Sequence, residues 1–192
     1  MIPSLKPGDR FPDYELPDHR GAPRKISELQ GNDPLALVLA RGSYCPKEDL
    51  QHQWMAAMQT ELKVGYCRFV TISTDQQMQS LEWRTRLGAH WPFLCDPDRK
   101  LQRELDIQEY TDPEHDPMIP HTLLLAPGLR IYAIYQGYWY FGRPTAEEIR
   151  QDFRAISRKC RPDWEINAPA LRRQYENGER EDFFPYNSRS DA

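Results

Sequence analysis

The chain alternates between short apolar runs and longer stretches in which apolar residues recur with a helical period. The run at residues 35–40, LALVLA, is too short for most helices and has the right length for a strand buried on both faces. The stretch at 46–63 then carries apolar side chains at near-helical spacing, namely Leu50, Trp54, Met58 and Leu62. The pattern therefore predicts a buried strand, a bend at 41–44, and a helix with an apolar stripe that faces the core.

The same two patterns continue along the chain. Further strands are predicted at 66–73, 91–94, 120–125 and 130–135, and the last two flank the turn sequence APGL, which predicts a β-hairpin. Three further helices are predicted. The first begins after Thr74 or Asp75, either of which could be its N-cap, and ends near Leu87. The second covers 99–105, and the third runs from 146 to about 159. Thr145 and Glu148 have the spacing of a capping box at the start of the last of these helices.

This order of strands and helices predicts an α/β fold with a mixed central β-sheet flanked by helices on both faces. Residues 1–34 are rich in proline and glycine and predict an extended N-terminal arm with a short hairpin near Asp18–Gly21. We expect residues 1–160 to form the domain and residues 161–192 to form a C-terminal helical extension with a short helix at 168–177. Aromatic residues at its end predict that this extension packs on the domain or on a partner subunit: Phe183, Phe184 and Tyr186.

The amino-acid composition limits which classes of protein this chain can belong to. The chain has 192 residues, of which 39% are hydrophobic and 28% charged, as expected for a folded, soluble protein. No apolar run of about 18 residues predicts a membrane span, and the net charge of −4 without a basic stripe argues against a nucleic-acid partner. The N-terminus resembles no secretory signal, so we expect a cytoplasmic protein with reduced thiols. The histidines are scattered and the four cysteines form no Cys-x-x-Cys pair, so neither a metal nor a cofactor is predicted.

Cys45 is the candidate for chemistry, because it lies between the first strand and a helix that begins with Pro46. The unsatisfied N–H groups of a helix N-terminus stabilise an anion such as a thiolate. Arg41 adds a positive charge from across the bend, whereas Glu48 and Asp49 oppose ionisation if they point at the sulfur. The alternative is a small, buried and inert cysteine, and the local pattern alone favours neither interpretation.

Several segments resemble, in the same order, the peroxiredoxin family (AhpC/TSA) of the thioredoxin-like fold. They are LKPGDRFPDYELPDHRG at the N-terminus, CPKE at Cys45, WPFLCDPDRKLQRELDI, and HTLLLAPGLRIYAIYQGYWYFGRPTAEEI. The resemblance covers roughly residues 4–160. It implies a thioredoxin-like fold and a thiol peroxidase in which Cys45 reduces a hydroperoxide. It also implies an external thiol reductant, thioredoxin-like or small, and the possibility of a homodimer.

The resemblance suggests roles for residues around Cys45. The N–H groups of the bend at Gly42, with Arg41 and His121, would polarise the peroxide. His121 falls near a position where peroxiredoxins carry an arginine, and Pro120 falls where thioredoxin-like folds carry a cis-proline; an ordinary turn proline beside an exposed histidine is the alternative. Cys160 faintly resembles the C-terminal cysteine that resolves the oxidised thiol across a dimer, although an external thiol is the favoured reductant.

The sequence also departs from the family pattern. Val38 and Gly42 stand where peroxiredoxins carry proline and threonine or serine, and Ser43 would replace that hydroxyl only if the bend differs. Glu48 stands where related branches carry the second cysteine of a Cys-x-x-Cys pair, which excludes dithiol exchange within the motif. These departures favour a second hypothesis, a thioredoxin-fold binding or scaffold module without catalysis. A third is disulfide exchange with a protein partner.

Overall fold

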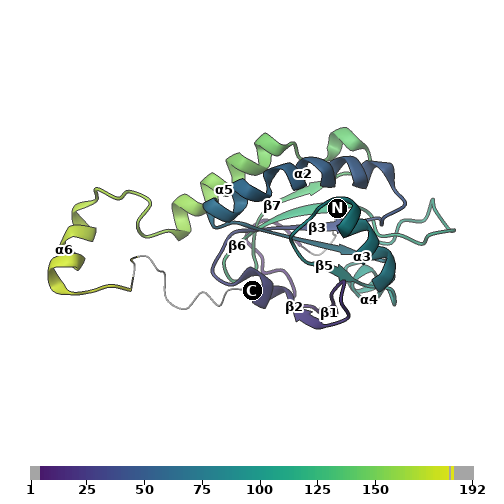
Figure 1. Ribbon diagram of the computed structural model, residues 1–192, viewed down its shortest axis with the longest axis horizontal. Coiled ribbons are helices and arrows are strands. Elements are labelled where there is room, and N and C mark those ends of the chain that lie inside the picture. The colour runs from purple at the N-terminus through teal and green to yellow at the C-terminus, as the bar shows by residue number, and fades with distance from the viewer. Residues whose placement is uncertain (1–4, 182, 184–192) are drawn as a thin grey trace.

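The computed structural model of the protein describes residues 5–181 and residue 183. A five-stranded sheet with the order β5-β4-β3-β6-β7 forms its centre (Figure 1). The strands are β3 (Leu35–Ala40), β4 (Arg68–Ser73), β5 (Phe93–Cys95), β6 (His121–Ala126) and β7 (Arg130–Gln136). Strand β3 pairs in parallel with β4, which pairs in parallel with β5, whereas β6 and β7 are antiparallel to their neighbours. The predicted mixed sheet and its hairpin are confirmed.

Strand β3 is buried along its whole length because side chains from both faces of the sheet enter a core. Leu35, Leu37 and Leu39 belong to one apolar cluster. Ala36, Val38 and Ala40 belong to the other cluster. This alternation with period two is the geometry of a strand, and it explains why the run contains no polar residue.

Helices and the N-terminal arm cover the two faces. Helices α2 (Pro46–Gly65) and α5 (Ala146–Cys160) lie side by side on one face, where α3 (Gln77–Arg86) adds Trp83 to the core (Figure 1). The other face is covered by three short elements and the arm. These elements are the hairpin of β1 (Glu15–Pro17) and β2 (Pro23–Lys25), α1 (Ile26–Gln30) and α4 (Lys100–Glu104). The predicted thioredoxin-like arrangement, with helices on both faces, is confirmed.

The prediction for the buried face of α2 was wrong at Leu50, which is 48% exposed. The helix instead buries Glu48, Gln51 and His52 in its first two turns, followed by Met55. The apolar period could not show this, because the buried polar side chains are satisfied by partners from distant segments.

The helix caps were predicted in part. Thr145 and Glu148 form the expected capping box of α5. The cap of α3 is Gln76 rather than Thr74 or Asp75. Asp75 is unavailable because its carboxylate accepts hydrogen bonds from the Ser43 N–H (2.8 Å) and the Ser73 hydroxyl (3.1 Å).

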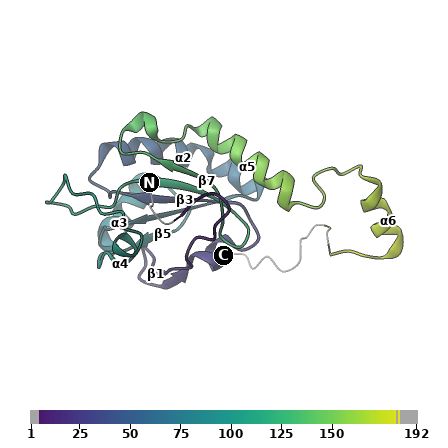
Figure 2. The ribbon, with the colours of Figure 1, turned by 180° about the vertical axis from the view of Figure 1, so that it is seen from behind.

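The C-terminal extension contains the predicted short helix, α6 (Pro169–Asn177). Figures 1 and 2 show α6 projecting away from the sheet and its covering helices. Phe184 and Tyr186 lie outside the described residues, and Phe183 is half-buried with the Arg180 guanidinium 5.7 Å from its ring. Packing of the extension on the domain or on a partner subunit stays a prediction.

Candidate active site

Cys45 is the N-cap residue of α2, five residues after the end of β3. Its backbone is extended (φ −88°, ψ 117°), and its carbonyl accepts the first helical hydrogen bonds, from the N–H groups of Glu48 and Asp49. Pro46 occupies the first turn, where its missing N–H costs nothing. The residue is 2% exposed, so its sulfur lies under a cover of neighbouring side chains.

Arg41 contacts the sulfur directly. Its Nη1 lies 3.6 Å from Cys45 Sγ, within the range of a hydrogen bond to sulfur. Its Nη2 donates to Glu109 (2.6 Å) and to Asp112 (3.0 Å). Burial alone would lower the pKa of Arg41, but hydrogen bonds to Glu109 and Cys45 raise it above its ordinary value. The guanidinium therefore stays charged beside the thiol.

The loop at 109–116 holds this arginine from outside. Asp112 accepts the Tyr44 hydroxyl (3.1 Å) and contacts His115 Nδ1 (2.9 Å). The rings of Tyr44 and His115 stack at 3.6 Å with an interplanar angle of 6°. The loop thus contacts both Arg41 and Tyr44 and holds them in place next to Cys45.

The two carboxylates that follow Cys45, Glu48 and Asp49, each pair with an arginine. Glu48 is fully buried and pairs twice with Arg143, Oε2 to Nη1 at 2.7 Å and Oε1 to Nη2 at 2.8 Å. A hydrogen bond from Arg86 lowers the pKa of Asp49. Both carboxylates therefore point at arginines and not at the Cys45 sulfur.

The Glu48–Arg143 pair also joins several elements. Glu48 Oε1 accepts the backbone N–H of Arg41 (3.1 Å). Arg143, which follows the short 3₁₀ helix η1 (Tyr140–Gly142), donates to Gln51 (2.6 Å), whose amide donates to Thr122 on β6 (3.0 Å). This buried network fixes the bend and the first turn of α2 against the sheet.

Gly42 and Ser43 explain why no hydroxyl reaches the thiol from the bend. Gly42 has φ +135°, and a Cβ at this position would lie 2.8 Å from Asp75 Oδ1. The N–H and the hydroxyl of Ser43 both bond to Asp75, so Ser43 does not replace the family's threonine. Burial raises the pKa of Asp75 above its ordinary value.

The sequence model of the AhpC/TSA family matches residues 7–134. The chain belongs to the AhpC/TSA family. It is 27% identical over 107 residues to a putative peroxiredoxin of Mycobacterium tuberculosis, which covers 54% of this chain and 68% of that protein. It is 25% identical over 130 residues to the 1-Cys peroxiredoxin PER1 of Triticum aestivum, which covers 64% of this chain and 59% of that protein.

Solved structures agree on the fold. The crystal structure of peroxidoxin BcpB from Mycobacterium tuberculosis superposes with a TM-score of 0.68 at 18% identity, covering 79% of this chain and 96% of that chain. The protein is therefore a peroxiredoxin-like member of the thioredoxin fold. Among the described residues, no helix combines the length and the apolar character needed to cross a membrane.

In this AhpC/TSA protein, Pro120 directly precedes β6 and His121 is the first residue of that strand, beside the Glu48–Arg143 network. They line a small hollow with Gln51 and Arg143. His121 Nδ1 bonds to the carbonyl of Ile119 (2.8 Å), and its buried Nε2 has no partner among the described residues. Burial lowers the pKa of His121 to about 4, so the ring is neutral. The structure thus brings Arg41 to the thiol and His121 to the network; the cis form of Pro120 stays a prediction.

Two of the other three thiols of this AhpC/TSA protein lie at the far end of α2, and the third lies two strands from β3. Cys67 follows α2, whose 20 residues span about 30 Å from the end at Cys45. Burial raises the pKa of Cys67 to about 12, and Cys160 at the end of α5 is near enough to contribute to that shift. Cys95 is buried at the end of β5, two strands from β3, or about 10 Å in the sheet. None of the three is placed beside the Cys45 sulfur within the described chain.

Sequence reasoning missed Glu109, Asp112 and Arg143. The first two come from a polar loop without periodicity, so only the fold brings them to Arg41. Arg143 directly precedes the Pro-Thr capping box, and its position inside a segment that resembles the family was the one available signal. Within the described residues, no three His, Cys, Asp or Glu side chains gather as a metal site requires.

Proposed function

We propose that Cys45 is a peroxidatic thiol that reduces hydroperoxides. The observation that carries the proposal is the 3.6 Å contact between Arg41 Nη1 and Cys45 Sγ at the N-terminus of α2. Two fixed sources of positive potential, the helix terminus and a buried guanidinium, meet at one sulfur. Family membership and the names of the relatives support the same chemistry.

The reaction is a nucleophilic displacement at oxygen. The thiolate attacks one peroxide oxygen, an S–O bond forms, and the O–O bond breaks. The sulfur is oxidised to a sulfenic acid while the peroxide is reduced to an alcohol, or to water from hydrogen peroxide. The proton lost by the thiol ends on the leaving oxygen, so that CysSH and ROOH give CysSOH and ROH.

Arg41 is the residue we assign to the peroxide. Its Nε is buried and has no partner among the described residues, so one donor remains for a peroxide oxygen. Glu109 and Asp112 hold the rest of the guanidinium in place. Arg41 thereby supplies, from the bend itself, the donor that the missing threonine hydroxyl would have provided.

Regeneration requires a thiol from outside this chain. The sulfenic acid would condense with that thiol, with loss of water, and a second thiol would release Cys45. Cys67 and Cys160 lie at the opposite end of α2, and Cys95 lies two strands away from β3, which supports this external route. Trp139, whose ring centroid lies 5.2 Å from Lys47 Nζ, and Phe141 are 73% and 98% exposed. They offer an apolar surface for a thioredoxin-like reductant or a second subunit. Resolution by Cys160 across a homodimer and a cytoplasmic location stay predictions.

Rapid mixing with hydrogen peroxide tests the proposal, with oxidation of the protein followed by tryptophan fluorescence or by loss of free thiol. We expect wild-type protein to react faster than free cysteine and Cys45→Ser to show no fast phase. Arg41→Met should slow the reaction by about 10- to 100-fold, since a charged hydrogen bond is worth about 1.5–3 kcal/mol. Arg41→Lys should retain part of the rate, because it keeps the charge but not the forked donors.

A wild-type rate no faster than that of free cysteine would contradict the peroxidase and favour the binding module. An unchanged rate in Arg41→Met, in a variant with normal thermal unfolding, would remove Arg41 from the mechanism while leaving Cys45 in it.

A further inference from the structure

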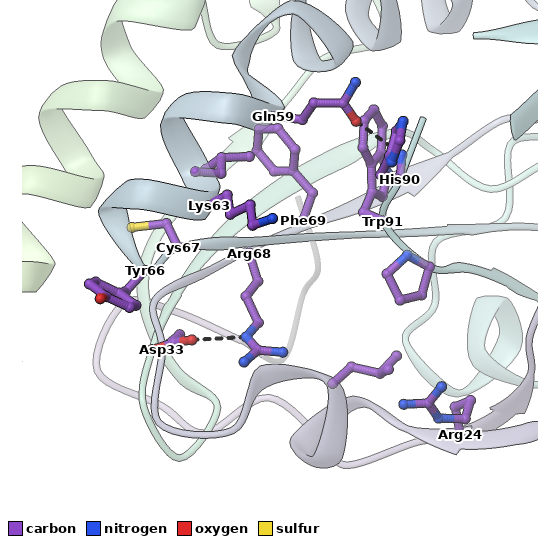
Figure 3. A pocket seen from close by; sticks show the side chains of 13 residues that line it. Arg24, Asp33, Gln59, Lys63, Tyr66, Cys67, Arg68, Phe69, His90 and Trp91 are labelled. Atoms are coloured by element: carbon purple, nitrogen blue, oxygen red, sulfur yellow. Dashed lines mark hydrogen bonds and ion pairs between the residues drawn. The ribbon is translucent and has the colours of Figure 1, made fainter. Parts of the chain in front are cut away.

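A cavity of about 590 Å³ opens at the end of α2 that lies farthest from Cys45 (Figure 3). Its walls come from the last turns of α2 and from the starts of β4 and β5, with α1 and β2 opposite. The apolar part of the lining consists of Leu29, Leu62, Phe69, Trp91 and Pro92. The rings of Phe69 and Trp91 meet edge to face, with centroids 5.4 Å apart. The volume falls within the range of small-molecule sites, about 300–1,000 Å³.

Three cations from three elements surround this apolar wall: Arg24, Lys63 and Arg68. In Figure 3 the Arg68 guanidinium and the Lys63 ammonium extend into the hollow, and Arg24 approaches from the opposite side. Arg68 bonds to Asp33 (2.9 Å), which also accepts from Arg161 (2.7 Å). Neither Arg24 nor Lys63 forms an ion pair with another described residue. The cavity therefore has excess positive charge, although the whole chain carries −4.

We propose that this cavity binds an anionic aromatic small molecule, a carboxylate on a flat ring system. Arg24 and Lys63 would pair with the carboxylate, and the ring would lie against Pro92 and the accessible edges of Phe69 and Trp91, whose side chains are otherwise buried in the core. A purely apolar ligand would place its surface against the two cations. A small inorganic anion would pair with the cations but would leave the apolar part of the lining exposed to water. The combination of both lining types selects a ligand that carries both chemistries.

The site is independent of the thiol chemistry. Cys45 lies at the opposite end of α2, about 30 Å away by helix rise. Cys67 is part of the cavity wall, but its thiol donates to the carbonyl of Gly65 (3.4 Å), and burial raises its pKa to about 12. The cavity therefore holds no activated nucleophile, and binding is the function that its lining supports.

The test uses 2-naphthoate as the probe, with titration calorimetry on the full chain, in parallel with quenching of the tryptophan fluorescence to which Trp91 contributes. We expect saturable binding that weakens with added salt. The neutral analogue 2-naphthylmethanol should bind at least about tenfold more weakly, a difference of about 1.4 kcal/mol, because it lacks the charge that pairs with the half-buried Arg24 and the exposed Lys63. Lys63→Met and Arg24→Leu should each weaken naphthoate binding by a similar factor.

Arg154→Leu is the matched control, because Arg154 is an exposed arginine on α5 outside the cavity. This variant should bind naphthoate as tightly as the wild type does. Equal binding of the neutral analogue would overturn the proposal, as would unchanged binding in the Lys63→Met, Arg24→Leu double variant or no saturation by the wild type in the millimolar range. Inorganic phosphate that binds as tightly as naphthoate would overturn the role of the apolar wall. These measurements involve no turnover, so their outcome is separate from that of the peroxide experiment.

Discussion

Gly42 shows at the scale of one residue why the bend differs from the family pattern. Its φ of +135° is a conformation that residues with a Cβ rarely adopt. A Cβ there would also approach Asp75 Oδ1 to 2.8 Å, and Asp75 is the group that holds the N–H of Ser43. The bend around Gly42 therefore has a conformation that leaves no room for the threonine, and the donor to the Cys45 sulfur is Arg41 instead.

Restoring the family residue should damage this bend. We expect Gly42→Thr to lower the free energy of unfolding by about 1–3 kcal/mol through backbone strain and the collision with Asp75, and to slow peroxide oxidation of Cys45. Urea unfolding and rapid mixing measure the two effects. Gly8→Ala is the control, because Gly8 also has a positive φ (+98°) but has no atom within 4 Å of a Cβ. A threonine variant as stable as the control, or one that reacts faster than the wild type, would contradict this account.

The buried histidines give stability a defined pH dependence. Burial lowers the pKa of His52 and of His121 to about 4, against about 6.5 in the unfolded chain. Between pH 4 and pH 6.5 the histidines are protonated in the unfolded state but not in the folded state. The contribution of the two neutral rings to the free energy of unfolding is therefore complete above pH 6.5 and is lost as the pH falls towards 4. From pH 7 to pH 5 we expect each histidine to reduce the free energy of unfolding by about 2 kcal/mol.

Urea unfolding at pH 7, 6 and 5 measures this slope. The His121→Leu variant should lose roughly half of it, because one of the two titrating rings is gone. An identical slope in wild type and variant would show that His121 does not titrate in this way.

At the scale of elements, the place of Cys45 was predictable and its partners were not. An apolar run, a bend and a Pro-initiated helix are local patterns, and they located both the strand and the helix that begins after Cys45. Arg41 was also identified, since it lies within the same bend. Glu109, Asp112 and Arg143 come from loops, where no period exists and only packing sets position. Leu50 failed as a core residue for a related reason, since a distant arginine allows α2 to bury Glu48 instead.

The Glu48–Arg143 pair should be essential for the stability of this junction. We expect Arg143→Met to lower the free energy of unfolding by about 3–5 kcal/mol, because it leaves the fully buried Glu48 carboxylate without its counter-charge. Chemical denaturation measures the loss. The control is Arg86→Met, which removes the half-exposed partner of Asp49 and should cost about 1 kcal/mol or less. Equal costs for the two variants would contradict the structural role of the buried pair.

At the scale of the whole molecule, the sheet and α2 separate two regions of different chemistry. One end carries Cys45, Arg41 and their acidic partners; the other carries the cationic cavity with Cys67, and Cys160 nearby. The order of elements in the sequence was sufficient to predict this fold class. The separation of the cysteines followed only from the completed sheet, because sequence spacing does not report which ends of the strands share an edge.

This separation makes the central claim, that Cys45 is the reacting thiol and lacks a resolving partner in its own chain, directly measurable. Reduced protein is treated with one equivalent of hydrogen peroxide in the presence of dimedone, and each cysteine-containing peptide is quantified by mass spectrometry. The account predicts that the sulfenic-acid adduct appears on Cys45 and that Cys67, Cys95 and Cys160 remain unlabelled thiols. An adduct mainly on another cysteine, or a disulfide joining Cys45 to one of them within a single chain, would contradict it.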